Sequence, residues 1–173
     1  MRMFSGFAAG IAMLIAGSAF AGEQFVDKTG FAVSGYDVVS YFDIAQSAVG
    51  SPQATPAVGK SSISTEYNGA TFAFSTEANR KRFLADPAAF APQYDGHCAY
   101  GVAKGGKVPG NPTLWRIVDG KLYLNITQNV VGFWEEDIPG NLKSSKKNWK
   151  GLEAKGASQD KIPGFKSSAP AKG

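Results

Sequence analysis

The sequence predicts a small single domain of the α+β class, in which two antiparallel β-hairpins form a small sheet packed by several short helices. Two dipeptides carry this prediction: Asn68-Gly69 and Asp119-Gly120 each lie between short runs of apolar and β-favouring residues. Both suit a type I′ turn, because Asn, Asp and Gly accept the positive φ angles that this turn requires. Helix signals follow each hairpin, and this order is typical of α+β rather than parallel α/β domains.

The chain before the first hairpin is predicted to enter the core and then to leave it. Residues 31–42 are apolar and aromatic, and they indicate a short strand or turn in which Gly35 permits a sharp bend. Residues 47–62 are rich in Ser, Pro, Gly and Ala, and they indicate a loop. In the hairpin that follows, Phe72 and Phe74 share one face of the second strand, which we expect to be buried.

Helices are predicted after both hairpins. Ser75 is a suitable N-cap for a helix that buries Phe83 and Leu84, and Asp86-Pro87 ends that helix and begins a shorter one. After the second hairpin, Thr127 is a suitable N-cap for a further helix, and a last helix closes the domain. Six aromatic side chains are expected in the core: Phe72, Phe74, Phe83, Phe90, Trp115 and Trp134.

The N-terminal end has the pattern of an export signal. Arg2 gives a positive start, residues 6–16 are an almost unbroken apolar run, and Ala19-Phe20-Ala21 fits the small-x-small pattern that signal peptidase recognises. A membrane anchor is the alternative, but the apolar stretch is short for a spanning helix and ends in a cleavage pattern. We expect residues 1–21 to be a removed signal peptide and residues 22–30 to be a leader. The mature protein is then periplasmic or secreted, with no transmembrane segment after processing.

Charge is distributed unevenly along the chain. Residues 22–140 contain nine Lys or Arg and twelve Asp or Glu, whereas residues 141–173 contain eight Lys and two acidic residues. The positive charge therefore belongs to the C-terminal end and not to the domain body. A basic tail can contact anionic lipid or polymer surfaces, but such a run is more often a solvated end, and we expect no nucleic-acid partner. Residues 31–152 are predicted to be the folded domain, and residues 153–173 a basic, disordered tail.

After removal of the signal, the chain has one histidine, His97, and one cysteine, Cys98. These counts exclude an intrachain disulfide, a Cys-x-x-Cys redox pair and a c-type haem attachment. They also exclude a blue-copper site and a structural zinc site within one chain, because both need more nitrogen and sulfur ligands.

Cys98 has two interpretations. It is a reactive thiol whose pKa is lowered by a cationic His97 and by Lys104 and Lys107, with Cys98 and His97 as the catalytic residues. Alternatively, it is an inert small residue of the core, and His97 lies at the surface. Neighbouring residues of a strand point to opposite faces, so the two side chains meet only in a turn, which Gly96 permits.

A metal site is a further candidate in the same segment. Asp95, His97 and Cys98 offer oxygen, nitrogen and sulfur within four residues, a group that could hold copper or zinc with help from elsewhere. Ligands usually come from separate elements, which counts against three such close neighbours converging on one ion.

Residues 67–94, with the sequence YNGATFAFSTEANRKRFLADPAAFAPQY, resemble the YHS-domain family. That family is marked by a Tyr/Asn-Gly hairpin, an aromatic strand, a helix ending in Phe, and a following Asp/Asn-Pro-x-x-aromatic pattern. The flanking segments SGYDVVSYF, QYDGHCAYGVAKG and WRIVDGKLYLN are similar to one exported bacterial branch. The resemblance covers nearly all of residues 31–152 and is more specific for the fold than for an activity.

The chain departs from the family at the metal-binding positions. Metal-handling relatives place two cysteines in a Phe-Cys-Ser-x-x-Cys pattern where this chain has Ser75 and Asn79, and the tripeptide Tyr-His-Ser does not occur. The resemblance therefore implies no metal binding through those cysteines. The exported branch keeps a cysteine resembling Cys98, and some members are described as selenoproteins, which implies redox or nucleophilic chemistry at that position.

These observations predict an exported domain with a single reactive or soft-metal-binding thiol, which takes part in redox chemistry or binds copper or zinc in the envelope. The alternative is a non-enzymatic binding module or accessory protein in which Cys98 is only structural. The partner is a small molecule, a metal or an envelope protein, and the sequence does not choose among them.

Overall fold

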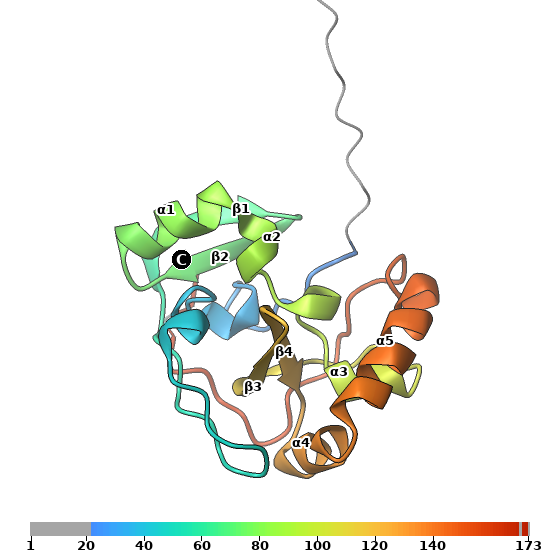
Figure 1. Ribbon diagram of the computed structural model, residues 1–173. Coiled ribbons are helices and arrows are strands. Elements are labelled where there is room, and N and C mark those ends of the chain that lie inside the picture. The colour runs from blue at the N-terminus through green and yellow to red at the C-terminus, as the bar shows by residue number, and fades with distance from the viewer. Residues whose placement is uncertain (1–21, 170, 173) are drawn as a thin grey trace, which may run out of the picture.

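A computed structural model of the protein describes residues 22–169 and 171–172 (Figure 1). The predicted signal peptide, residues 1–21, lies outside the described residues. The fold is α+β, as predicted, and the hairpins and helices belong to one domain body. In chain order the elements are the 3₁₀ turns Val33–Gly35 and Ser40–Asp43, β1 (Lys60–Tyr67), β2 (Ala70–Phe74), α1 (Glu77–Ala85), α2 (Pro87–Phe90), the 3₁₀ segment Gln93–Gly96, α3 (Ala99–Ala103), β3 (Asn111–Val118), β4 (Lys121–Asn125), α4 (Gln128–Glu135) and α5 (Ile138–Leu152).

The two hairpins have the turns that their dipeptides predict. Asn68 and Gly69 have φ angles of 48° and 75°, and Asp119 and Gly120 have φ angles of 49° and 70°. β1 pairs with β2 and β3 with β4, both antiparallel, but the two pairs are separate two-stranded sheets and not one sheet. β1 begins at Lys60, so the loop predicted over residues 47–62 is shorter than expected.

The hairpins stay apart because the aromatic segment 31–42 packs between them (Figure 1). Val38, Val39 and Tyr41 of this segment are fully buried. They share one core cluster with the aromatic residues of β2 and with Trp115, Leu122 and Leu124 of the second hairpin. The ring of Tyr41 meets Trp115 edge-on at 5.4 Å between centroids. The predicted strand or turn is thus the centre of the core.

Five of the six aromatic residues predicted for the core are at least 97% buried, and Phe90 is half-buried. Phe90 closes the rim of the core, where its ring meets Phe42 at 5.2 Å between centroids. The prediction was wrong for Leu84, whose side chain is 49% exposed. α1 rests on β2 through one side only, and a residue next to Phe83 is rotated by about 100° away from that side.

Asp and Thr side chains cap α1, α2, α4 and α5, and one of these caps differs from the prediction. Thr76, not Ser75, caps α1 through a hydrogen bond from the Asn79 amide. Thr127 caps α4, as predicted, and Asp137 caps α5. Ser75 is not available as a cap because its hydroxyl donates to Asp37 instead.

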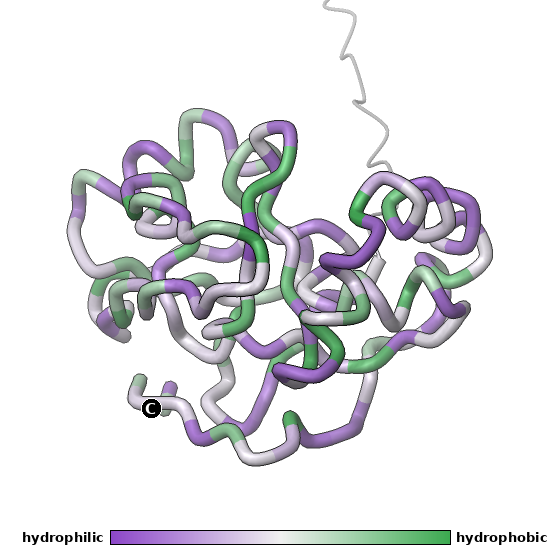
Figure 2. The backbone as a smooth tube through the Cα atoms, turned by 60° about the horizontal axis from the view of Figure 1, so that its bottom comes forward, coloured by the Kyte–Doolittle hydropathy of each residue, from purple (hydrophilic) through white to green (hydrophobic). Residues whose placement is uncertain are grey.

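Both segments that were assigned to the ends of the domain pack on its body. In the leader, Phe25 is 4% exposed and its amide donates to the carbonyl of Asp95 at 2.8 Å. The tail leaves α5, runs along one side of the body and ends beside β2 (Figures 1 and 2), where the Lys172 amide donates to the Thr29 carbonyl at 2.7 Å. The prediction of a disordered tail is therefore wrong for residues 153–169 and 171–172. Ile162 and Phe165, spaced among the lysines, hold the tail on the body.

Within the described part of the chain, no helix has the length and apolar character needed to cross a bilayer.

Candidate functional site

The segment that carries the only His and Cys has an unusual backbone. Tyr94, Asp95 and Gly96 have φ angles of 57°, 53° and 77°, three left-handed residues in a row. Such conformations cost energy in residues other than glycine, so surrounding contacts must hold them. His97 and Cys98 follow in extended conformation. The bend sends the side chains of Asp95, His97 and Cys98 into three different surroundings.

Cys98 lies in the interior with none of its side chain exposed. Its sulfur caps α3, where it accepts a hydrogen bond from the Gly101 amide at 3.3 Å, and its thiol donates to Asn125 Oδ1 at 3.5 Å. Burial raises the pKa of the thiol, and backbone N–H groups, that of Gly101 foremost, oppose the rise without cancelling it. The thiol is therefore protonated at neutral pH and has no contact with solvent.

His97 is also fully buried and not at the surface. Its Nδ1 lies 2.9 Å from the Tyr94 carbonyl oxygen, and its Nε2 accepts a hydrogen bond from the Ser158 amide at 3.1 Å. A carbonyl can only accept and an amide can only donate, so the ring is the neutral tautomer with its proton on Nδ1. Burial is the main cause that lowers the pKa of His97 to about 4. The imidazole is therefore not the cation that the reactive-thiol hypothesis requires.

The structure does not bring the imidazole and the thiol together. The His97 ring packs against Phe25 and Trp149, at 6.0 Å and 6.4 Å between centroids. Cys98 faces the other way, toward Asn125 at the end of β4. This is the arrangement expected of neighbouring residues in extended backbone. A Cys98–His97 pair in which the ring takes the proton of the thiol is not formed.

Lowering the pH from 7 to 5 is expected to destabilise the protein through His97. Its folded-state pKa of about 4 lies below the ordinary 6.5, so the unfolded chain binds the proton more readily. The stability that the neutral His97 ring contributes is fully present above about pH 6.5 and is lost as the pH falls toward 4. At pH 5 the free energy of unfolding is lower by about 2 kcal/mol for this reason. Urea unfolding at both pH values measures it. The His97→Gln variant, which has no ring to titrate, should lose less; an equal loss in both proteins would contradict the assignment.

Asp95 makes contacts with the leader rather than with His97 or Cys98. Its Oδ1 accepts a hydrogen bond from Gln24 Nε2 at 2.7 Å, while its Oδ2 is buried and has no hydrogen-bond partner among the described residues. Burial raises the pKa of the carboxyl group, and Lys107 acts in the opposite direction. The three predicted metal ligands thus have separate surroundings. Among residues 22–169 and 171–172, no three His, Cys, Asp or Glu side chains form a group that could hold a metal ion.

A pocket of about 380 Å³ lies between the leader and the tail. Residues 25–28 form one wall, and residues 158–162 with Phe165 form the other. The buried His97 lies behind this lining, because its ring contacts Phe25 and its Nε2 accepts from the amide of Ser158. The volume is within the range of about 300–1,000 Å³ that is usual for small-molecule sites. Sequence patterns do not indicate this pocket, because its walls come from the predicted leader and the predicted tail, which lie outside the predicted domain.

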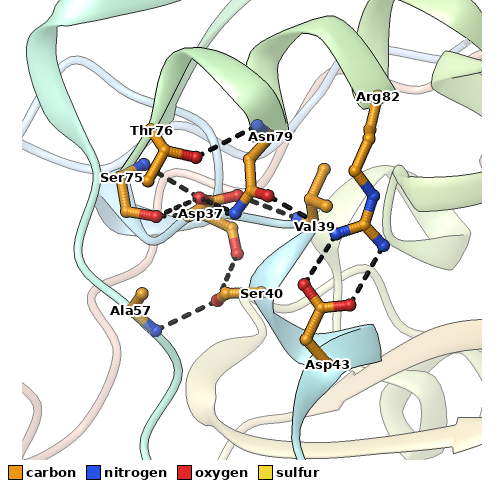
Figure 3. Close-up of polar contacts among 9 residues, drawn as sticks. All are labelled: Asp37, Val39, Ser40, Asp43, Ala57, Ser75, Thr76, Asn79 and Arg82. Atoms are coloured by element: carbon orange, nitrogen blue, oxygen red, sulfur yellow. Dashed lines mark hydrogen bonds and ion pairs between the residues drawn. The ribbon is translucent and has the colours of Figure 1, made fainter.

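A buried carboxylate, Asp37, lies in a second polar site at the junction of β2 and α1 (Figure 3). Its Oδ2 accepts from the Ser75 amide at 2.8 Å, the Ser75 hydroxyl at 2.6 Å and Asn79 Nδ2 at 2.7 Å. Its Oδ1 accepts from the Val39 amide at 3.0 Å. Four donors therefore satisfy one carboxylate. The lone acidic residue in the apolar run 31–42 was the signal that sequence reasoning missed.

Ser75 and Asn79 are the two positions that, by the resemblance seen in the sequence, correspond to cysteines of metal-handling YHS proteins. The structure brings these positions together, but their side chains donate hydrogen bonds to Asp37. This network joins the central 3₁₀ turns to the start of α1, and we interpret it as structural.

Comparison of the chain with protein-family models, with curated proteins and with solved structures finds no match. The resemblance to the YHS-domain family thus rests on the residue pattern alone.

The sites differ in what they can do chemically. The thiol, the imidazole and the Asp37 carboxylate are buried and have hydrogen-bond partners in the protein. The pocket is open and is lined by both apolar and charged side chains. Of the sites described, the pocket is the one suited to a ligand from solution.

Proposed function

We propose that the protein is an exported, YHS-like, non-enzymatic binding module that holds a small amphipathic anion in the pocket between the leader and the tail. The pocket is the observation that carries this proposal, because it is concave, of ligand size and mixed in character. Its neighbour His97 is neutral and fully hydrogen-bonded, which supports binding rather than proton transfer.

The charges of the pocket favour an anionic ligand with an apolar part. Phe25, Ile162 and Phe165 supply apolar surface. The carboxylates of the pocket have internal partners: Asp27 Oδ1 accepts from the Thr29 hydroxyl, and Asp160 Oδ2 accepts from the Ser158 hydroxyl. Lys28 and Lys161 form no ion pair within the described residues. The hydroxyl groups leave both carboxylates charged, so the lining carries two negative and two positive groups. The two ammonium groups are the ones able to bind a carboxylate, sulfonate or phosphate.

A second candidate function is the reactive or soft-metal-binding thiol, for redox chemistry or for copper or zinc. The observation in its favour is that backbone N–H groups of Tyr100, Gly101 and Ile126 lower the pKa of Cys98. Burial outweighs them, so this function requires the segment to open and expose the sulfur. The structure, in which the sulfur is buried, supports the binding module better than the reactive thiol.

Binding of 8-anilinonaphthalene-1-sulfonate, an amphipathic anion, tests the proposal. The folded protein should bind one equivalent with increased dye fluorescence. Lys161→Glu should weaken binding by about fivefold or more, because it places a negative charge beside the sulfonate. Lys143→Glu, which reverses an exposed charge on α5 outside the pocket, should change it by less than about twofold. Cys98→Ser should also bind normally, since the sulfur does not line the pocket.

The same samples distinguish the second candidate. Iodoacetamide should modify Cys98 only when the protein is unfolded in urea, because the thiol is buried and protonated. Rapid alkylation of the folded protein, or loss of dye binding in Cys98→Ser, would favour the thiol. Absence of dye binding, or equal effects of the two lysine variants, would contradict the pocket proposal.

A further inference from the structure

Among the described residues, one buried carboxylate oxygen has no hydrogen-bond partner, although the other oxygen of the same carboxylate accepts a hydrogen bond. Asp95 Oδ1 accepts a hydrogen bond from Gln24 Nε2, while Oδ2 is shielded from solvent and accepts a hydrogen bond from none of the described residues. A buried carboxylate oxygen without a hydrogen-bond donor lowers the stability of the fold, so a donor is expected near Asp95 Oδ2.

The residue that faces this oxygen is Gly22. A Cβ placed on Gly22 would overlap Asp95 Oδ2 and would lie 2.6 Å from the carbonyl oxygen of Glu153. Since the Cα–Cβ bond is only about 1.5 Å long, the Gly22 Cα must lie within about 4 Å of Oδ2. The backbone nitrogen is one bond further, within about 5 Å. Gly22 is itself buried, and it is the residue at which the mature chain is predicted to begin.

We propose that cleavage after Ala21 creates the missing partner of Asp95, which is the α-ammonium group of Gly22. Hydrolysis of the Ala21–Gly22 peptide bond consumes one water, leaves a carboxylate on Ala21 and leaves an amine on Gly22 that takes up a proton. Before cleavage this nitrogen is an amide with one N–H and no charge. After cleavage it is a cation with three donors.

The surroundings suit an ammonium group. Asp95 Oδ2 and the Glu153 carbonyl oxygen are both acceptors on the side of Gly22. An α-amino group has an ordinary pKa of about 8, so it is charged at neutral pH. Lys107, the other cation of this region, does not take the place, because its Nζ donates to the carbonyls of Glu153 and Lys155. Its Nζ forms no ion pair with Asp95.

The ion pair would connect processing to the shape of the site. Asp95 is one of the left-handed residues that place His97, and its carbonyl accepts from the Phe25 amide. Phe25 lines the pocket. A new charge pair at Gly22 therefore fixes the leader against this bend. It also explains a glycine at residue 22, since any side chain would overlap Asp95 Oδ2.

A double-mutant cycle tests the proposal. One protein begins at Gly22, released from a fusion by a protease that leaves no extra residue, and the other carries Ser-Ala before Gly22. Each is made with Asp95 and with Asp95→Asn, and urea unfolding is measured at pH 7. Asp95→Asn should lower the folding equilibrium constant by a factor of about ten or more in the protein that begins at Gly22. In the extended protein this factor should be smaller by about threefold or more. Glu66→Gln, an exposed carboxylate of β1, is the matched control and should act equally in both.

Titration of the α-amino group by NMR gives a readout that does not depend on how well Asp95→Asn folds. The pKa of the amino group should be about one unit above its ordinary value in the protein that begins at Gly22. Equal effects of Asp95→Asn at both chain lengths, or an unshifted amino group, would overturn the proposal. A mature chain found by intact-mass measurement to begin at another residue would overturn it too.

Discussion

Replacing Phe83 by Ala is expected to lower the free energy of unfolding by about 3–5 kcal/mol, the largest effect of any single truncation considered for this protein. The Phe83 ring is fully buried at the point where α1 meets the first hairpin. It lies 5.1 Å from the ring of Phe72, 5.2 Å from that of Phe74 and 5.6 Å from that of Tyr67, between centroids. Truncation leaves a cavity among three aromatic rings that cannot all move in to fill it.

Thermal unfolding measures this loss, and Leu84→Ala is the matched control. Leu84 belongs to the same helix and is 49% exposed, so its truncation should cost less than about 1 kcal/mol. For a domain of this size, Phe83→Ala should lower the melting temperature by on the order of 10 °C. Equal melting temperatures for the two variants would show that α1 does not rest on the hairpin through Phe83.

Replacing Asp37 by Ala is expected to cost at least about 3 kcal/mol, through hydrogen bonding rather than packing. The change leaves the Ser75 hydroxyl, the Ser75 amide and Asn79 Nδ2 without their acceptor. A donor left without a partner at such a part-buried site costs about 1–3 kcal/mol. The loss should be visible in urea unfolding as a lower midpoint with an unchanged slope, because the surface exposed on unfolding stays the same.

Asp43→Ala is the control for this prediction. Asp43 also accepts hydrogen bonds from a residue of α1, Arg82, but its side chain is 51% exposed. A surface ion pair of this kind contributes about 1 kcal/mol or less. If Asp43→Ala and Asp37→Ala were equally destabilising, the buried network of Figure 3 would not be what holds α1 to the central turns.

Local patterns predicted the parts of the fold that local chemistry controls. The positive φ angles at Asn68-Gly69 and Asp119-Gly120 follow from residues that tolerate them, and both hairpins formed. The Thr127 and Asp86 caps are likewise properties of a few neighbouring residues. The prediction of the Ser75 cap failed because of a contact that is distant in sequence. Ser75 was assigned as a cap because a serine in front of a helix suits that role, but a partner 38 residues away competes for its hydroxyl.

The candidate site could be predicted only in part. The sequence indicated residues 95–98 as the candidate site, and the backbone is strained where this segment begins, at Tyr94 and Asp95. It could not show which way each side chain points, because that depends on three consecutive left-handed residues. The pocket could not be predicted either, because residues 25–28 and residues 158–162 with Phe165 form its two walls only when the leader and the tail meet.

The sequence by itself determined the α+β class, the two hairpins, the aromatic core and the limits on chemistry that one His and one Cys impose. Those properties depend on residue type and on spacing along the chain. The tertiary structure alone decided that Cys98 and His97 are buried on opposite sides, that residues 153–169 pack on the domain body and that Asp95 faces Gly22. Burial and charge environment are set by residues far apart in sequence. They change a thiol or an imidazole from a reactive group into a neutral, hydrogen-bonded part of the core.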